Sequence, residues 1–302
     1  MARDLETRVF TPVIPPEHKK QEQDFLRFVD YMNRKAAEIG MTGSHFCDAA
    51  GMHNVVTARD LLRLIVYADR YPALRKVWTT DCYTVTVGGD NPRQMPCASK
   101  SMHPDLDDYY RVLGKKGGSL MSSRTGLYVY NLMSILEIPG SEDRLAVVAM
   151  YAQEGNQHPN NRFKATKQIA DVAMAKYKDP NTDISAMPVC CENAIVALLP
   201  ADNGDYTVLY EKNADTVGRP MSISKVLTAV CVLDYVKDLS EKITYHAFDT
   251  NIGGFYISDY IPGDIVTYQD ALYALMLESS NVTAQALARS VGIKIKDLEK
   301  SC

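Results

Sequence analysis

Two β-hairpin patterns in the middle of the chain limit its fold more than any other feature. In residues 127–152, "LYVYNLMSILE" and "RLAVVAMYA" flank the turn residues Pro139 and Gly140. In residues 193–212, apolar segments flank Asn203–Gly204, a pair that favours two-residue hairpin turns. Runs of β-branched and apolar residues on both sides of such turns predict antiparallel strand pairs. We therefore expect an antiparallel sheet.

Helical patterns surround the two hairpins. Apolar residues recur at helical spacing after residue 23 and end before Gly40, and Thr57 with Asp60 forms a capping pattern before another helix. Counting the first of these, helices are expected at 24–40, 162–178, 222–238 and 268–291. A strand is expected at 78–88 and a long loop at 88–105. Strands and helices in separate blocks predict an α/β fold of the α+β kind, with an antiparallel sheet flanked by helices plus a helical lobe.

Composition argues against several classes of partner. The 302 residues are 46% hydrophobic with a net charge of −4, which argues against nucleic-acid binding, and no apolar run is long enough for a membrane span. The first residues lack the apolar core of a signal peptide. We expect either a cytoplasmic protein or one whose export signal is absent from this chain.

The segment "MSISKVLTAV" (221–230) places Ser222 three residues before Lys225. Residues three apart share a helix face, so the amine lies within reach of the hydroxyl. A serine nucleophile needs an adjacent base, and lysine serves when burial lowers its pKa. The alternative is the polar start of an amphipathic helix.

Two further segments offer companion groups for this pair. Ser279-Ser280-Asn281 places a second hydroxyl and an amide 57 residues after Ser222; it also suits a helix N-cap, and Asn281 begins a sequon for glycosylation. Lys116-Gly117-Gly118 offers a second lysine on a predicted strand, with Arg124–Gly126 as a rival.

A third cluster of chemically active side chains contains His45, Cys47, Asp48 and His53. Their spacing matches no structural zinc motif, so we expect no metal. No cofactor is expected either.

These motifs together resemble the D-alanyl-D-alanine carboxypeptidases, low-molecular-weight penicillin-binding serine peptidases of the β-lactamase/transpeptidase-like fold. The resemblance is carried by "VLYEKNADTVGRPMSISKVLTA", "ALMLESSNVTAQALAR" and "FVDYMNRKAAEIGMTGSHFCDAAGMHNVVTARDLLRLIVYA", and covers residues 24–178 and 190–292. It implies a peptidoglycan-type peptide or a β-lactam as substrate, and a place in the cell envelope if the family role holds.

The order of the segments differs from that of the family. Residues 24–178 resemble its C-terminal half and 191–302 its N-terminal half, joined by a linker at 179–190. We therefore expect an arm at 1–23 and one circularly permuted catalytic domain at 24–302, which chain termini lying close together would permit. The alternative is a domain-swapped dimer, in which each half completes its site in another chain.

The resemblance assigns a role to each motif residue. Ser222 is the acylated serine, Lys225 its base, Ser279 the proton shuttle and Asn281 the binder of a substrate amide. Lys116 is the strand lysine, followed by Gly117 and Gly118, and the N–H groups of Ser222 and Ser119 form the oxyanion hole. The family has threonine where Gly117 stands, and that hydroxyl helps to bind a substrate carboxylate.

Three hypotheses follow for the function. The first is a serine-type D-Ala-D-Ala carboxypeptidase-like hydrolase that forms an acyl-enzyme on Ser222. The second, motivated by Gly117, is a β-lactamase or esterase on the same scaffold. The third is a non-catalytic binding protein that retains the fold.

Overall fold

The structure, a computed structural model, describes residues 16–121, 128–152, 158, 160–201, 204–250 and 260–301. The rival motif Arg124–Gly126, the turn residue Asn203 and most of the arm expected at 1–23 lie outside the described residues. Within the described ranges, no helix has the length and apolar character needed to cross a lipid bilayer.

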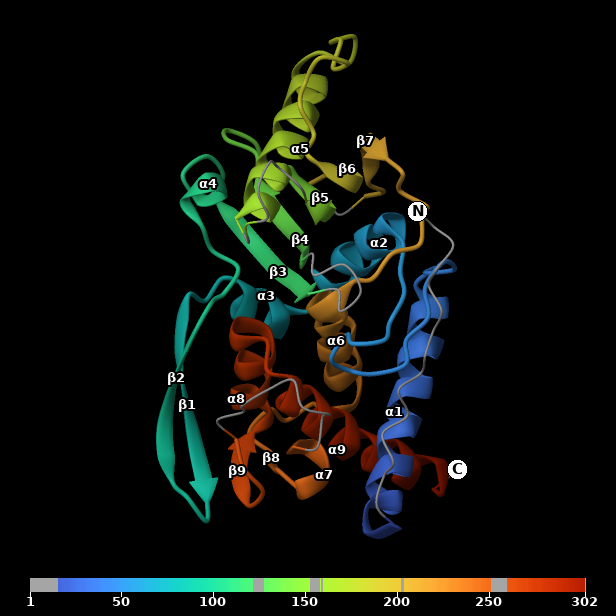
Figure 1. Cartoon of the computed structure of the whole chain (residues 1–302), viewed down its shortest axis with the longest axis vertical. Helices are drawn as coiled ribbons and strands as arrows, with labels where there is room; N and C mark the ends of the chain where they lie inside the picture. Colours follow the sequence, from blue (N-terminus) through green and yellow to red (C-terminus); the bar gives the residue numbers. More distant parts are fainter. Residues whose placement is uncertain are drawn as a thin grey trace.

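A five-stranded antiparallel sheet forms the centre of the fold, in the order β3-β4-β5-β6-β7 (Figure 1). Its strands are β3 (Val112–Met121), β4 (Tyr128–Glu137), β5 (Arg144–Ala152), β6 (Cys191–Leu199) and β7 (Thr207–Lys212). The two predicted hairpins are the pairs β4–β5 and β6–β7, so both predictions are confirmed. Strand β6 pairs with β5, which joins the earlier and later halves of the chain into one sheet.

Helices cover both faces of this sheet. Helix α5 (Asn161–Lys178) packs on one face, and α2 (Ala58–Ala68) packs on the other together with the core around α6 (Lys225–Tyr235) (Figure 1). Because both faces of β4 and β5 are buried, these strands are apolar almost throughout instead of alternating with polar residues.

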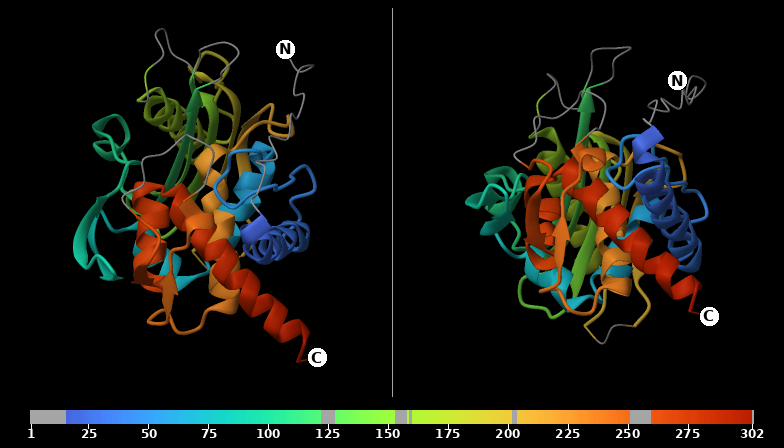
Figure 2. Two further views of the ribbon diagram at one scale, coloured as in Figure 1. Left: turned by 60° about the horizontal axis from the view of Figure 1, so that its bottom comes forward. Right: turned by 90° about the horizontal axis from the view of Figure 1, so that it is seen from below.

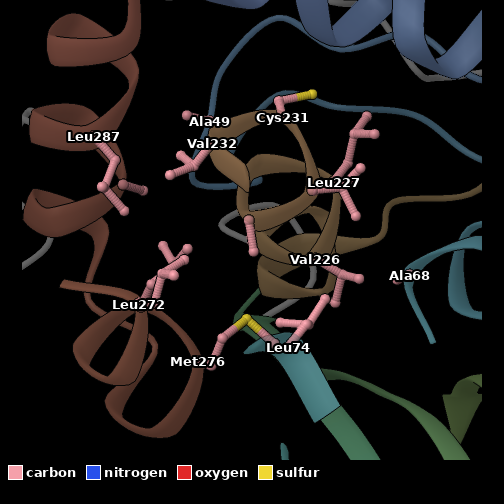
Figure 3. Packing of buried hydrophobic residues seen from close by; sticks show 14 of the residues in the cluster. Ala49, Ala68, Leu74, Val226, Leu227, Cys231, Val232, Leu272, Met276 and Leu287 are labelled. Atoms are coloured by element: carbon pink, nitrogen blue, oxygen red, sulfur yellow. The ribbon is translucent and has the colours of Figure 1, made fainter. Parts of the chain in front are cut away.

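Helix α6 lies at the centre of the larger apolar core. Every residue from Lys225 to Leu233 is buried, so the helix is enclosed by its neighbours on all sides. Val226, Leu227 and Val232 point outward from α6 in different directions, and Leu287 of another helix faces it across the core (Figure 3). This packing fixes the position of the helix that begins at Lys225.

A second sheet lies beside the helical lobe, in the order β2-β1-β9-β8 (Figure 1). Its strands are β1 (Cys82–Gly89), β2 (Arg93–Ala98), β8 (Lys242–Thr244) and β9 (Asp264–Thr267). The short helices pack on other elements: α3 (Pro72–Trp78) contacts β3, α4 (Pro104–Asp107) packs against α5, and α7 (Ala247–Thr250) packs against the helix α9 (Asn281–Glu299).

The prediction of a long loop at 88–105 is wrong, because this segment contains strand β2 and the start of α4. Met95 and Cys97 are buried while Gln94 and Pro96 are exposed, which is the alternation of a strand. Proline is tolerated because β2 is an edge strand, where a missing N–H costs no ladder bond.

The helices expected at 222–238 and 268–291 are each interrupted. The first begins as a 3₁₀ turn, η2 (Met221–Ser224), before α6. The second is divided into α8 (Tyr268–Tyr273), a π-helical turn η3 (Ala274–Glu278) and α9 (Asn281–Glu299). The break occurs because Ser279 adopts a left-handed φ of 65° and Ser280 caps α9 through the Thr283 N–H.

The first and last long helices of the chain lie side by side. Helix α1 (Lys19–Glu38) follows a 3₁₀ turn, η1 (Pro16–His18), so it begins within the segment expected to be an arm. Both views of Figure 2 show α1 alongside α9, and Gly292 brings the two backbones close at Asp24. The first and last long helices of the described chain therefore pack against each other in the helical lobe.

Candidate active site

Ser222 lies in the turn η2, and hydrogen bonds to the central sheet hold the segment just before this turn. Its predecessor Met221 has a left-handed φ of 53°, a strained conformation that persists only where surrounding contacts impose it. Two strands of the central sheet supply such contacts at Arg219. The Asn131 amide donates to the Arg219 carbonyl at 2.8 Å, and the Arg219 N–H donates to the Tyr151 hydroxyl at 2.7 Å. The sheet therefore fixes the turn that presents Ser222.

Lys225 begins helix α6, and its side chain is fully buried. Its Nζ lies 2.8 Å from Ser222 Oγ, 2.6 Å from Asn281 Oδ1 and 2.9 Å from the Ala50 carbonyl oxygen. Three residues predicted to act together, Ser222, Lys225 and Asn281, thus share one hydrogen-bond cluster around a single nitrogen.

The three partners of this nitrogen accommodate both forms of the amine, since the ammonium form would donate to all three oxygens. Two of the three, the Ala50 carbonyl and the Asn281 amide oxygen, only accept hydrogen bonds. A neutral amine has two N–H groups for these oxygens, which leaves its lone pair for the third partner, the Ser222 hydroxyl. The pKa of Lys225 is lowered from its usual 10.5 to about 7, mainly by burial; the Asp48 carboxylate opposes this shift and the Lys100 charge adds to it. The neutral form is therefore well populated near neutral pH.

A loop before α2 holds the Ala50 carbonyl in place. The Asp48 carboxylate accepts hydrogen bonds from four backbone N–H groups, those of residues 50, 51, 52 and 53. Gly51 has a φ of +99°, and a Cβ there would lie within the Met221 carbonyl group, so only glycine fits. Asp48 therefore anchors this loop through its hydrogen bonds. Within the described residues, no three or more His, Cys, Asp or Glu side chains lie close enough together to hold a metal ion.

Lys116 and Ser279 form a second cluster. The Lys116 Nζ donates to Ser279 Oγ at 2.9 Å and to the Gly117 carbonyl at 3.0 Å. Burial lowers the pKa of Lys116 well below its usual value, and the charges of Lys225, Arg162 and Lys100 lower it further. The left-handed φ of Ser279 turns this hydroxyl out of the helical path and toward β3.

Strand β3 brings the second cluster against the first. Directly opposite residues share a face of a sheet, so Lys116 and Gly118 lie on the face of their partners Met133 and Asn131, toward η2. A Cβ on Gly118 would lie 2.6 Å from the Pro220 carbonyl and 3.0 Å from the Ser222 nitrogen. Glycine at 118 therefore allows β3 to approach the backbone of Ser222.

The Ser119 N–H, one of the two donors expected to form the oxyanion hole, points to the open edge of β3. Strand β3 is at the edge of the sheet, and the Gly117 N–H points outward from that edge to Ser101 Oγ at 3.0 Å. In an antiparallel ladder the direction of N–H groups repeats every second residue, so the Ser119 N–H also points to the open edge. The Ser119 side chain is exposed.

Several residues that support the site were not predicted from the sequence. Asn131 and Tyr151 brace the turn, Asp48 anchors the loop, and Ser101 and Arg162 lie at Gly117. Only Asp48 had a recognisable signal, since an aspartate before small residues and glycine is typical of a side-chain-capped turn. The roles given to Ser222, Lys225, Ser279, Asn281 and Lys116 stay predictions.

The chain is similar to peptidases that act on D-alanyl-D-alanine, over part of its length. The family model described as D-alanyl-D-alanine carboxypeptidase matches residues 191–296. That range includes Ser222, Lys225, Ser279 and Asn281, and excludes Lys116.

Two curated relatives agree over shorter stretches. The D-alanyl-D-alanine endopeptidase of Escherichia coli (strain K12) is 40% identical over 58 residues, which are 18% of this chain and 19% of the relative. The protein of the same name from Pseudomonas aeruginosa is 45% identical over 60 residues, 19% of each chain. The chain thus spans about a fifth of the length of the curated relatives it matches. No solved structure matches it.

Proposed function

We propose that this protein is a serine-type D-Ala-D-Ala peptidase-like hydrolase that acts through an acyl-enzyme on Ser222 and binds penicillins. One observation carries the proposal: the Lys225 amine lies 2.8 Å from the Ser222 hydroxyl and has a pKa of about 7. A serine hydroxyl next to a largely neutral, buried amine is an activated nucleophile.

The first step is acylation. Lys225 accepts the Ser222 proton as Oγ attacks the carbonyl carbon of the scissile amide, and the negative charge on the carbonyl oxygen is stabilised by the N–H groups of Ser222 and Ser119. The bond to the leaving amine then breaks. Ser279, hydrogen-bonded to Lys116, delivers a proton to that amine, and the proton held by Lys225 replenishes this relay.

The second step is hydrolysis of the ester on Ser222. A water molecule gives a proton to the neutral Lys225 and attacks the ester carbonyl, and the Ser222 oxygen leaves with a proton returned from the same amine. The products are the shortened acid and the free enzyme. With a β-lactam, the opened ring stays attached as an acyl group unless water reaches the ester.

The order of the two halves supports a circular permutation relative to the family. Strand β6 of the later half pairs with β5 of the earlier half, and residues 179–190 link α5 to β6 within the same chain. The long helices α1 and α9, which come from the earlier and the later half, also pack against each other. A domain-swapped dimer would give the same contacts between two copies.

Mass spectrometry of the intact protein after exposure to a penicillin tests the chemistry. We expect one added penicillin on the wild-type chain, none on Ser222→Ala, and a modified peptide containing Ser222. Absence of an adduct at high penicillin concentration, with a folded protein, would contradict the proposal and favour the non-catalytic binding protein.

Two further measurements separate the remaining alternatives. Turnover of a chromogenic cephalosporin compared with turnover of a peptide ending in D-Ala-D-Ala distinguishes a β-lactamase or esterase from a peptidase. A native mass measurement distinguishes a permuted monomer from a swapped dimer: a single-chain mass supports permutation, and a stable double mass supports swapping.

A further inference from the structure

The segment that joins η3 to α9 carries two of the site residues and has an unusual backbone. Ser279 is left-handed, with φ 65° and ψ 35°, and the Ser280 N–H donates to the Ala274 carbonyl at 3.2 Å at the end of the π-helical turn. A residue other than glycine keeps a left-handed conformation only where surrounding contacts impose it. The contacts of Ser280, which lies between Ser279 and Asn281, therefore bear on the position of both site residues.

A row of three hydroxyl groups reaches Ser280 from the second sheet. The hydroxyl of Tyr245, the residue directly after β8, lies 2.8 Å from Thr283 Oγ1, and Thr283 Oγ1 donates to Ser280 Oγ at 2.9 Å. Since the threonine hydroxyl has one proton and gives it to Ser280, Tyr245 is the donor to Thr283. Ser280 Oγ also accepts the Thr283 N–H at 3.1 Å, the bond that caps α9.

Tyr245 is itself held firmly in place. The residue is 1% exposed, and its ring stacks on Tyr260 with the ring centroids 4.7 Å apart. Its N–H donates to the Asp264 carbonyl at 2.8 Å, and Arg289 of α9 donates to the neighbouring Thr244 carbonyl at 2.7 Å. Burial raises the pKa of the Tyr245 hydroxyl above its usual value, so this group stays protonated and remains a donor.

Both neighbours of Ser280 contact a lysine of the candidate site. Ser279 Oγ accepts from the Lys116 amine at 2.9 Å, and Asn281 Oδ1 accepts from the Lys225 amine at 2.6 Å. Because consecutive Cα atoms are fixed about 3.8 Å apart, Ser280 cannot move without displacing one or both of its neighbours. A shift of Ser280 would therefore lengthen these two short contacts.

Resting on the proposed function, we propose that Tyr245 and Thr283 are positioning residues of the active site. They hold Ser280, and through it they place Ser279 and Asn281 against their two lysine partners. They act through Ser280 and not by contact with the substrate. The second sheet thereby takes part in organising a site whose other groups come from the central sheet and the helical lobe.

Two variants that remove one hydroxyl each test this inference. Tyr245→Phe and Thr283→Val keep the shape of the side chain, and we expect either one to slow the acylation of Ser222 by penicillin about 10- to 100-fold. The upper figure is the cost of misplacing a reacting group by about 1 Å. Thr283→Ser keeps the hydroxyl without the methyl group and should retain most of the wild-type rate. A role in packing alone would give the opposite order, with valine better than serine.

Tyr268 and Ser290 provide the matched controls. Tyr268 is also a buried tyrosine, 1% exposed, and its hydroxyl lies 2.6 Å from Ser290 Oγ in the same helix α9. Ser290 comes seven residues after Thr283, which is about 10 Å farther along the helix axis. Tyr268→Phe and Ser290→Ala should therefore leave the acylation rate unchanged, even where urea unfolding shows the same loss of stability as in Tyr245→Phe.

Backbone hydrogen exchange gives a second readout that does not depend on acylation. The N–H groups of Ser280 and Thr283 are hydrogen-bonded within the segment that the hydroxyl row holds. Loss of one hydrogen bond from this row should make local opening more frequent, so we expect these two amides to exchange roughly 2- to 10-fold faster in Tyr245→Phe. Their exchange should stay at the wild-type rate in Tyr268→Phe.

The outcomes distinguish this inference from the proposed function. A folded Tyr245→Phe protein that is acylated as fast as Tyr268→Phe would overturn the inference, as would a Thr283→Ser protein as slow as Thr283→Val. If Tyr245→Phe does not fold, Thr283→Val is the second variant, with the same expected direction. If penicillin forms no adduct on wild-type Ser222, the proposed function fails and hydrogen exchange alone decides the inference: faster exchange supports it, and unchanged exchange overturns it.

Discussion

The Lys116 amine donates to the Ser279 hydroxyl at 2.9 Å, although 163 residues separate them in the chain. Lys116 lies on the edge strand β3 and Ser279 on the break between η3 and α9. The contact therefore forms only when the sheet and the helical lobe are packed together. It also joins two motif residues that the sequence places far apart.

Replacing Lys116 by methionine should slow acylation by penicillin at least about 100-fold, since a positioned proton-transfer group contributes 10²–10⁴-fold. The side chain keeps its apolar stem and loses the amine that orients Ser279. The second-order rate of adduct formation on Ser222 measures the effect. Lys115→Met is the matched control, because Lys115 is also a buried lysine of β3 but faces the other side of the sheet. Equal rates in the two variants would contradict the role of Lys116.

The acylation rate should rise with pH through about 7 and then level off. Lys225 must be neutral to accept the Ser222 proton, and its pKa is lowered to about 7 by burial, so its protonated form dominates below that pH. The second-order rate of penicillin acylation, measured from pH 5.5 to 9 at constant ionic strength, gives the midpoint. A rate that is independent of pH over this interval would exclude Lys225 as the base.

Asp48 should control both the stability of its loop and the pH profile. Asp48→Ala leaves four backbone N–H groups without their acceptor, which we expect to lower the free energy of unfolding by about 1–3 kcal/mol. Loss of the carboxylate also removes a charge that raises the pKa of Lys225, so the midpoint of the acylation profile should move to lower pH.

The control for Asp48 is Asp183→Ala, which removes a carboxylate that caps an exposed turn in the linker. Urea unfolding and the pH–rate profile of the two variants separate the effects. A destabilised Asp48→Ala protein with an unchanged midpoint would show that Asp48 acts on the loop alone.

Much of the central sheet was predictable because its signals are local. Apolar runs on both sides of Pro139–Gly140 and Asn203–Gly204 specify the hairpins β4–β5 and β6–β7 within about 25 residues each. The pair Ser222 and Lys225 was predictable for the same reason, since three-residue spacing alone places them on one side of a helical turn. Strand β2 was missed because Pro96 interrupts its pattern, which is tolerated only at a sheet edge.

The remainder depends on contacts between distant segments. Ser101, Gly117 and Arg162 come from a loop, a strand and a helix, and no spacing in the sequence relates them. The left-handed φ of Ser279 is equally invisible in "MLESSNVT", because a serine at that position suits an ordinary helix cap. Such features arise from packing, which the local pattern of one segment does not contain.

Gly118 sets how closely β3 approaches the turn that carries Ser222. Alanine at 118 would place its Cβ 2.6 Å from the Pro220 carbonyl and 3.0 Å from the Ser222 nitrogen, and both neighbours are backbone atoms that cannot rotate away. The strand and the turn must therefore separate, which moves the Ser119 N–H relative to Ser222 and weakens the oxyanion hole. Because removing one oxyanion donor typically costs 10²–10³-fold in rate, we expect Gly118→Ala to slow acylation by about that factor.

Gly88→Ala in β1 is the control: its new Cβ would meet only the Ile265 carbonyl, at an ordinary 3.7 Å. A Gly118→Ala protein that is acylated as fast as Gly88→Ala would mean that β3 does not supply the oxyanion donor.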